Sequence, residues 1–304
     1  GNEIDRAYLE AAMRVSVASE RDLKIVYTPM HGVGETVVAA LLQHAGFRDV
    51  DVLASQRSPD GDFPNVPGHV SNPEIPKTLQ AAIDQARRTA ADLVIASDPD
   101  ADRIGVAVPT TSDPMGEWTN LTGNQIGVLL SAFVIDRMNQ AGRLLAGHYL
   151  VTTLVTSEMA GELARQVHVN VEADLLVGFK WIAARIDEKG PNDFLFGFEE
   201  SHGYLGGLHV RDKDAGVAAL LMAELAAHLK AAGQSVLSYL DELYLRAGHY
   251  LEDQINIYLE GREGVAQAQK LMQAFRETPP LMIAGLPVVA ISDYKTGVRR
   301  LLDG

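Results

Sequence analysis

Hydrophobic and polar positions in the first 120 residues follow two alternating periods. Short apolar runs at 23–27, 50–54 and 92–97 are typical of buried strands. Between them, apolar residues recur at helical spacing and predict two helices, one with Val37, Val38, Leu41, Leu42 and Ala45 on its face and one with Leu79, Ala82, Ile83 and Ala86. A loop rich in Pro, Gly, Asp and Asn separates them at 56–76. This order predicts an α/β domain with a mixed, mainly parallel sheet.

The same alternation repeats further along the chain. Apolar runs predict strands at 149–155, 169–177 and 194–199, and helical spacing predicts helices at 122–138, 157–167 and 215–232. We therefore predict two consecutive α/β domains, residues 1–120 and 121–246. Residues 247–304 hold about one helix and one strand, which is too little for a domain, so we expect the chain to end inside a further one.

Composition narrows the possible partners and chemistry. The chain has 26 basic and 40 acidic residues, and its net charge of −14 argues against a nucleic-acid or anionic-membrane partner. It has no cysteine, which excludes disulfides, cysteine zinc sites, iron–sulfur clusters and thiol nucleophiles. The N-terminal segment lacks the apolar core of a signal peptide, and the apolar run at 127–135 is too short to cross a bilayer. We expect a soluble, cytoplasmic protein.

Three aspartates are the strongest chemical signal in the sequence. Asp98, Asp100 and Asp102 follow a buried strand at every second position, and Arg103 comes directly after them. Converging carboxylates in such a loop suit a hard divalent cation, Mg²⁺ first. An EF-hand is excluded, since Arg103 replaces the glycine of its sixth position. The alternative is a solvated acidic loop.

Three further motifs carry weaker signals. Lys180, in VGFKWI, is a phosphate ligand, a proton donor or a lysine lying along its aromatic neighbours. Glu199 and Ser201, in GFEESHGY, suit sugar hydroxyls but also fit an ordinary polar turn. In RDKDAG, Asp212 or Asp214 would cap a long helix and hold Lys213 near its N-terminus, where anions bind.

Taken in order, the motifs TPMHGVG, SDPDADRIGVAV, LTGNQIGVLL, VGFKWI, GFEESHGY and RDKDAG resemble the α-D-phosphohexomutase superfamily. The likeness is to the phosphoglucomutases and phosphomannomutases, and within them to bacterial phosphoglucomutases and the phosphopentomutase-like branch. It covers nearly the whole chain. The resemblance implies two consecutive three-layer α/β/α domains, the second and third of four, followed by the beginning of the fourth.

The resemblance also implies an activity, that of an intramolecular phosphotransferase. A phosphoserine of the first domain transfers its phosphoryl group to a hexose phosphate. The resulting hexose bisphosphate reverses its orientation in the site and returns its other phosphoryl group to the serine. Asp98, Asp100 and Asp102 would bind Mg²⁺, and Arg103 would contact the reacting phosphoryl group. Sugar hydroxyls would be held by Glu199 and Ser201, with Lys180 and Lys213 near the phosphoryl group.

Two elements of that family are missing from the printed sequence. It contains no Thr-Ala-Ser-His-Asn-Pro-like nucleophile loop, and VSNPE at 70–74 lacks the histidine; the Arg-x-Ser-Gly-Thr-Glu-Pro-like phosphate clamp is absent too. We therefore expect no turnover from this chain alone. The alternatives are a non-catalytic module that binds metal or phosphosugar, and a Mg²⁺ phosphohydrolase with Asp98 as nucleophile. Glucose, mannose, pentose and glucosamine phosphates remain open as substrates, as does the oligomeric state.

Overall fold

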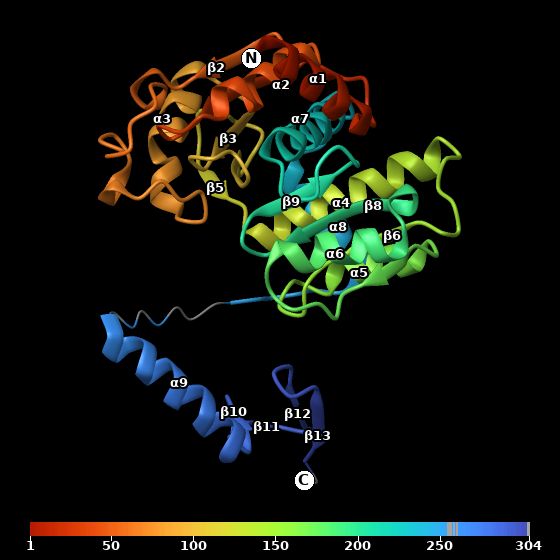
Figure 1. The fold of residues 1–304 in the computed structure, drawn as a ribbon. Helices are drawn as coiled ribbons and strands as arrows, with labels where there is room; N and C mark the ends of the chain where they lie inside the picture. Colours follow the sequence, from red (N-terminus) through yellow and green to blue (C-terminus); the bar gives the residue numbers. More distant parts are fainter. Residues whose placement is uncertain (254–256, 258, 260, 303–304) are drawn as a thin grey trace. The chain divides into compact units, whose positions relative to one another are not determined.

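A computed structural model describes residues 1–253, 257, 259 and 261–302. The chain divides into two compact units, Gly1–Tyr250 and Leu251–Gly304. The first unit contains two β-sheets, each with helices on both faces, as the sequence predicts (Figure 1).

The first sheet has the strand order β2-β1-β3-β4-β5. Its strands are β1 (Lys24–Thr28), β2 (Asp49–Val52), β3 (Leu93–Ser97), β4 (Ile104–Pro109) and β5 (Trp118–Asn120). β1 pairs in parallel with β2 and β3, whereas β3, β4 and β5 are antiparallel neighbours. The antiparallel half follows from loop length, because the segment 98–103 is too short for the crossover that parallel pairing requires. The aspartate loop is therefore the tight connection of a β-hairpin.

Three helices belong to this sheet: α1 (Asn2–Ala12), α2 (Val38–His44) and α3 (Gln80–Thr89). α3 covers one face through a separate core that includes Val26, Leu79, Ile83 and Val94. The predicted helices are confirmed, but the strand predicted at 50–54 ends at Val52, since a short 3₁₀ turn begins at Ala54.

The second sheet has the order β7-β6-β8-β9. Its strands are β6 (Tyr149–Val151), β7 (Asn170–Glu172), β8 (Phe194–Glu199) and β9 (Gly203–Gly206), and only β9 runs antiparallel to its neighbour. The predictions 149–155 and 169–177 were too long. After Val151 the backbone leaves the sheet, and the Thr153 and Thr156 hydroxyls bond to each other at 2.9 Å in the loop that follows. β9 was not predicted.

Five helices accompany the second sheet: α4 (Gly123–Gln140), α5 (Met159–Gln166), α6 (Phe179–Lys189), α7 (Ala215–Ala231) and α8 (Val236–Ala247). Thr122 caps α4 in a capping box with Gln125. Asp214 caps α7 by accepting a hydrogen bond from the Val217 amide at 3.0 Å, so of the two candidate caps it is Asp214 that serves. α6 begins at Phe179, and the residues directly before it, which belong to the strand predicted at 169–177, form a loop.

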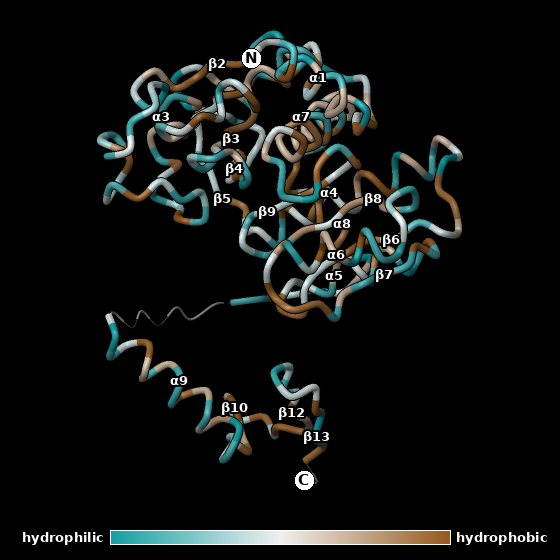
Figure 2. Tube along the Cα trace, in the orientation of Figure 1, coloured by the Kyte–Doolittle hydropathy of each residue, from teal (hydrophilic) through white to brown (hydrophobic). Residues whose placement is uncertain are grey.

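Helix α7 joins the two sheets into one body. Its residues are nearly all buried and strongly hydrophobic (Figure 2), and it packs against α2 on one side and against α4 and β9 on the other. Near its middle, the fully buried Glu224 carboxylate accepts hydrogen bonds from the Val17 amide at 2.9 Å and the Arg21 guanidinium at 2.8 Å. The segment after α1 is thereby fixed across α7.

The second unit contains α9 (Gly261–Glu277) and two short hairpins. The hairpins pair β10 (Met282–Ile283) with β11 (Leu286–Pro287), and β12 (Ala290–Asp293) with β13 (Val298–Leu301). The sequence predicted the helix but only one strand in this region.

Among the described helices, none is by itself both long and apolar enough to cross a membrane. The pair α7 and α8 meets that test only when the two are taken together, and they are bent by 95° at the break between them.

Candidate functional site

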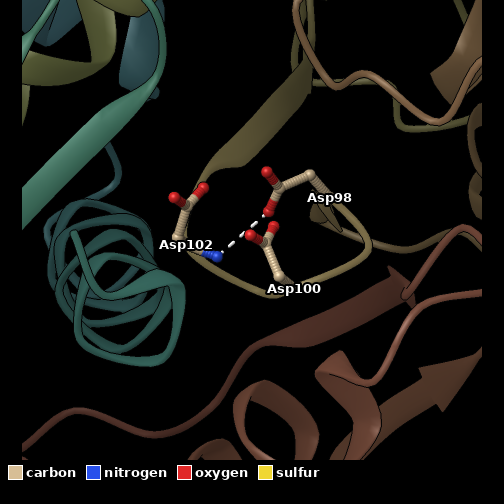
Figure 3. A group of neighbouring side chains, drawn as sticks. All are labelled: Asp98, Asp100 and Asp102. Atoms are coloured by element: carbon tan, nitrogen blue, oxygen red, sulfur yellow. Dashed lines mark hydrogen bonds between the residues drawn. The ribbon is translucent and has the colours of Figure 1, made fainter. Parts of the chain in front are cut away.

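The three predicted aspartates converge at the carboxyl end of β3. Asp98, Asp100 and Asp102 each offer a carboxylate oxygen within 4.8 Å of the others (Figure 3). Asp98 is buried, Asp102 is half-buried and Asp100 is exposed, so the group opens toward solvent on one side. Ala101 holds the turn in a left-handed conformation, with φ of 58°. The hairpin connection thus points three anionic groups at one small volume.

Asp98 is held by the loop that follows it. Its Oδ1 accepts hydrogen bonds from the amides of Asp102 and Arg103, both at 3.0 Å, and its Oδ2 accepts from Arg103 Nε at 2.8 Å. Burial nevertheless raises the Asp98 pKa to about 6, with the Asp102 charge adding to the rise and the Arg103 hydrogen bonds opposing it. A further cation bound nearby would stabilise the ionised form of Asp98, which burial disfavours.

Arg103 connects the aspartate loop to the long loop before α3. Its Nη1 donates to Glu74 at 3.0 Å and lies 3.5 Å from the side-chain oxygen of Asn72. Burial lowers the Arg103 pKa, but the ion pairs with Asp98, Glu74 and Asp102 outweigh this and the pKa is raised. The guanidinium therefore stays charged beside the aspartates.

Lys213 reaches the same loop from the residue before Asp214, the cap of α7. Its Nζ lies 2.8 Å from Asp102 Oδ2. Burial acts to lower the Lys213 pKa, while Asp102, Asp212 and Glu199 raise it further, so the ammonium is retained. The other Asp102 oxygen, Oδ1, is buried without a hydrogen bond, although Arg103 Nε is 3.5 Å away. This oxygen is therefore a hydrogen-bond acceptor without a donor among the described residues.

Close backbone contacts fix the position of the loop. A Cβ on Gly32 would lie 2.4 Å from Pro99 Cα, and the Val33 amide donates to the Pro99 carbonyl at 2.9 Å. TPMHGVG is therefore a tight turn that packs against the aspartate loop. His31 is buried in it, with Nδ1 2.8 Å from the Ser58 carbonyl oxygen, which is a structural role.

The second sheet supports the loop from the opposite side. His202 Nδ1 donates to the Ile104 carbonyl at 2.9 Å, and the Ile104 amide donates to the His202 carbonyl at 3.2 Å. A Cβ on Gly203 would lie 2.2 Å from Lys213 Cδ, so a side chain here would displace the lysine stem from its present path. The turn in GFEESHGY therefore also joins the second sheet to the first at the start of β4, and it is not merely a polar turn.

Glu199 ends β8 close to this group. It is 4% exposed, and its Oε1 accepts from the Gly178 amide at 2.7 Å. Burial raises the Glu199 pKa and the Gly178 hydrogen bond opposes the rise; Lys213 also lowers it, which places the two within electrostatic range. The neighbouring Glu200 accepts from the Thr156 hydroxyl at 3.1 Å.

Besides Glu199, two predicted site residues do not touch the aspartate loop. Lys180 lies exposed in the first turn of α6, with its Nζ 5.5 Å from the Trp181 ring centroid. Ser201 is half-buried in the turn between β8 and β9. Within the described part of the chain, neither side chain forms a hydrogen bond or ion pair.

Sequence reasoning missed two side chains at this site, Asn72 and Glu74. Both belong to the segment VSNPE, which was compared only with a nucleophile loop. Their signal was present, since two polar side chains flank a proline in a loop of the same domain, but nothing in the sequence joins them to an arginine about 30 residues later.

Comparisons with known proteins agree with this architecture. Residues 6–111 match the phosphoglucomutase/phosphomannomutase α/β/α domain II, and residues 122–246 match domain III. A phosphoglucomutase of Staphylococcus epidermidis is 36% identical over 284 residues, which are 93% of this chain and 50% of that protein. A Staphylococcus aureus phosphoglucomutase is equally similar over 283 residues. The chain spans about half the length of these relatives.

Solved structures share the fold at lower identity. A phosphoglucomutase/phosphomannomutase family protein from Burkholderia thailandensis aligns over 79% of this chain and 46% of its own, with a TM-score of 0.59 at 18% identity. The parafusin phosphoglucomutase from Paramecium, in an open form, aligns over 99% of this chain and 51% of its own, with a TM-score of 0.55 at 16% identity. The chain belongs to the phosphoglucomutase/phosphomannomutase family and contains its α/β/α domains II and III.

Proposed function

We propose that this chain provides the metal-binding and sugar-binding parts of a Mg²⁺-dependent phosphohexomutase, which interconverts hexose 1-phosphate and hexose 6-phosphate through a hexose bisphosphate. One observation carries the proposal: Lys213, in the third-domain loop just before helix α7, pairs with Asp102 of the second-domain aspartate loop. Three carboxylates and two cations thus meet in one site of a chain whose net charge is −14. That combination suits a divalent ion next to a phosphoryl group.

The residues present fit a magnesium ion. Asp98, Asp100 and Asp102 offer three hard oxygen ligands within reach of one another, and the buried Asp102 Oδ1 has no hydrogen-bond donor. Mg²⁺ bound there would neutralise charge on the oxygens of a transferring phosphoryl group. Arg103 and Lys213, both charged, would attract and orient that phosphoryl group through their N–H donors.

Glu199 is the candidate for sugar recognition. Among the described residues, the Gly178 amide is its one hydrogen-bond donor, so the carboxylate retains acceptor capacity for sugar hydroxyls. Ser201 would add a hydroxyl that both donates and accepts. We assign Lys180 to the same rim because α6 begins directly after the Gly178 amide that binds Glu199. Its exposed ammonium would meet a substrate phosphate without first breaking an ion pair.

Turnover would also need a phosphoserine, and the printed sequence has no loop of the family's type for it. We propose that residues 1–120 and 121–246 act as domains two and three, with 247–304 beginning the fourth. Asp98 is a poor candidate for the nucleophile of a phosphohydrolase, because both of its carboxylate oxygens accept hydrogen bonds from the loop itself.

Glucose 1,6-bisphosphate is the ligand for the test. Its binding in the presence of Mg²⁺ should be saturable by calorimetry, and Glu199→Gln should weaken it about tenfold while Glu117→Gln, an exposed site of the same unit, leaves it unchanged. Glucose 1-phosphate should not be converted by the 304-residue chain. Unchanged binding in Glu199→Gln would reject the sugar-site assignment, and substantial turnover would reject the need for an added phosphoserine.

A further inference from the structure

A cavity of about 690 Å³ lies away from the aspartate loop. Its walls come from the end of α1 and the segment after it, the C-terminal half of α4, the loop before β6, and the strands β8 and β9. Its apolar surface includes Val134, Met138 and Leu221. This volume is that of a small-molecule site, and none of the residues assigned to phosphoryl transfer lines it.

The charge of the cavity is opposite to that of the chain. Arg14, Arg143, His148 and His209 line it, and none of the described residues that line it is acidic, although the chain carries 40 acidic residues. Arg14 and Arg143 are exposed, and within the described ranges neither guanidinium has a carboxylate or hydrogen-bond partner. Two unpaired guanidiniums beside an apolar wall form a positive region that is selective for anions.

His148 provides a further donor in the wall of the cavity. It is 6% exposed, and its Nδ1 accepts a hydrogen bond from the Leu145 amide at 3.0 Å. In the neutral form of the ring the proton is therefore on Nε2, and this nitrogen has no partner among the residues that the structure describes. A ligand with an acceptor oxygen would satisfy this donor.

His209 adds a second unfilled group on the same wall. Its Nε2 donates to Asp214 Oδ2 at 2.8 Å, and this leaves Nδ1 as an acceptor that is buried without a partner. Asp214 is also the cap of α7, so the ring is held rigidly in place. The cavity therefore presents fixed polar groups on a largely apolar surface, as ligand sites do.

We propose that this cavity binds a small organic anion, with an apolar ring or chain against Val134, Met138 and Leu221 and a phosphate or carboxylate near Arg14, Arg143 and His148 Nε2. The proposal is independent of the phosphohexomutase assignment. An apolar body accounts for the walls, and the anionic group accounts for the unpaired guanidiniums and the Nε2 donor of His148.

The probe is 8-anilinonaphthalene-1-sulfonate, an apolar ring system with one anionic group, followed by its fluorescence. The double variant Arg14→Gln/Arg143→Gln should weaken saturable binding about tenfold, and His148→Asn, which keeps an acceptor for the Leu145 amide, about threefold. Arg48→Gln is the matched control, because Arg48 is an exposed arginine of the same unit without a described partner. Its affinity should not change.

Competition experiments with the dye show which class of anion the cavity binds. Displacement of the dye by adenosine monophosphate would indicate a phosphorylated ligand, and displacement by octanoate a carboxylate. Equal dye affinity in the double variant and the parent chain would show that the dye binds elsewhere and would overturn the proposal. Displacement by neither competitor would overturn it as well, because it assigns the cavity to these two classes of anion.

Discussion

The burial of His202 predicts a measurable dependence of stability on pH. His202 is 6% exposed, and burial, aided by the Arg103 charge, lowers its pKa from the ordinary 6.5 to about 4 despite its hydrogen bond to Ile104. The unfolded chain therefore binds a proton that the folded chain does not. Stability contributed by the neutral ring is complete above pH 6.5 and is lost as the pH falls toward 4.

The magnitude follows from the two pKa values. A difference from 6.5 to about 4 corresponds to about 3 kcal/mol once the ring is protonated in both the unfolded and the folded state, below about pH 4, and to about 2 kcal/mol at pH 5. Asp98 titrates in the same range with the opposite sign, since its pKa is raised to about 6 and its protonated form is favoured in the folded chain. A variant of His202 is therefore needed to separate the two.

His202→Asn is that variant. Asparagine keeps an N–H donor for the Ile104 carbonyl and tolerates the left-handed backbone at this position, where φ is 65°. Urea unfolding followed by tryptophan fluorescence reports on the first unit, because Trp118 and Trp181 both lie in it. Between pH 7.5 and pH 5, the parent chain should lose about 2 kcal/mol more than the variant. An equal loss in both would refute a buried neutral imidazole.

Three further predictions concern charge. Glu224→Leu leaves Arg21 and the Val17 amide without their acceptor and should lower the free energy of unfolding by about 3 kcal/mol, measured by urea unfolding; a loss below 1 kcal/mol would contradict the interaction. Lys213→Met removes a cation 2.8 Å from Asp102 and should tighten Mg²⁺ binding several-fold by calorimetry, whereas weaker binding would contradict competition between the two cations. Because Asp98 has a pKa of about 6, Mg²⁺ affinity should be nearly constant above pH 7 and about tenfold weaker at pH 5, and an affinity independent of pH would exclude Asp98 as a ligand.

Local signals in the sequence predicted much of the fold. The caps Thr122 and Asp214 act within four residues of themselves, so their helices could be located from sequence alone. Strand ends were less predictable. The run at 149–155 is rich in β-branched residues, yet only its first three residues pair, because sheet pairing depends on the partners available and not on propensity alone.

The candidate site divides in the same way. Asp98, Asp100 and Asp102 are neighbours in sequence, and their convergence follows from the loop between two strands. The pairing of Lys213 with Asp102 joins residues 111 positions apart and depends on α7 packing between the two sheets. No sequence pattern ranks Lys213 above Lys180, and only the geometry shows that Lys213 contacts the aspartate loop while Lys180 lies exposed on α6.

A Mg²⁺ titration by calorimetry tests the central claim most directly. The parent chain should bind one Mg²⁺ at the aspartate loop, and Asp100→Asn should abolish that binding, because it removes a ligand without disturbing the hydrogen bonds of Asp98. Asp241→Asn, on the exposed face of α8, is the control for general attraction to an acidic protein and should bind as the parent does. Equal binding by the parent chain and Asp100→Asn would contradict the assignment of the loop as the metal site.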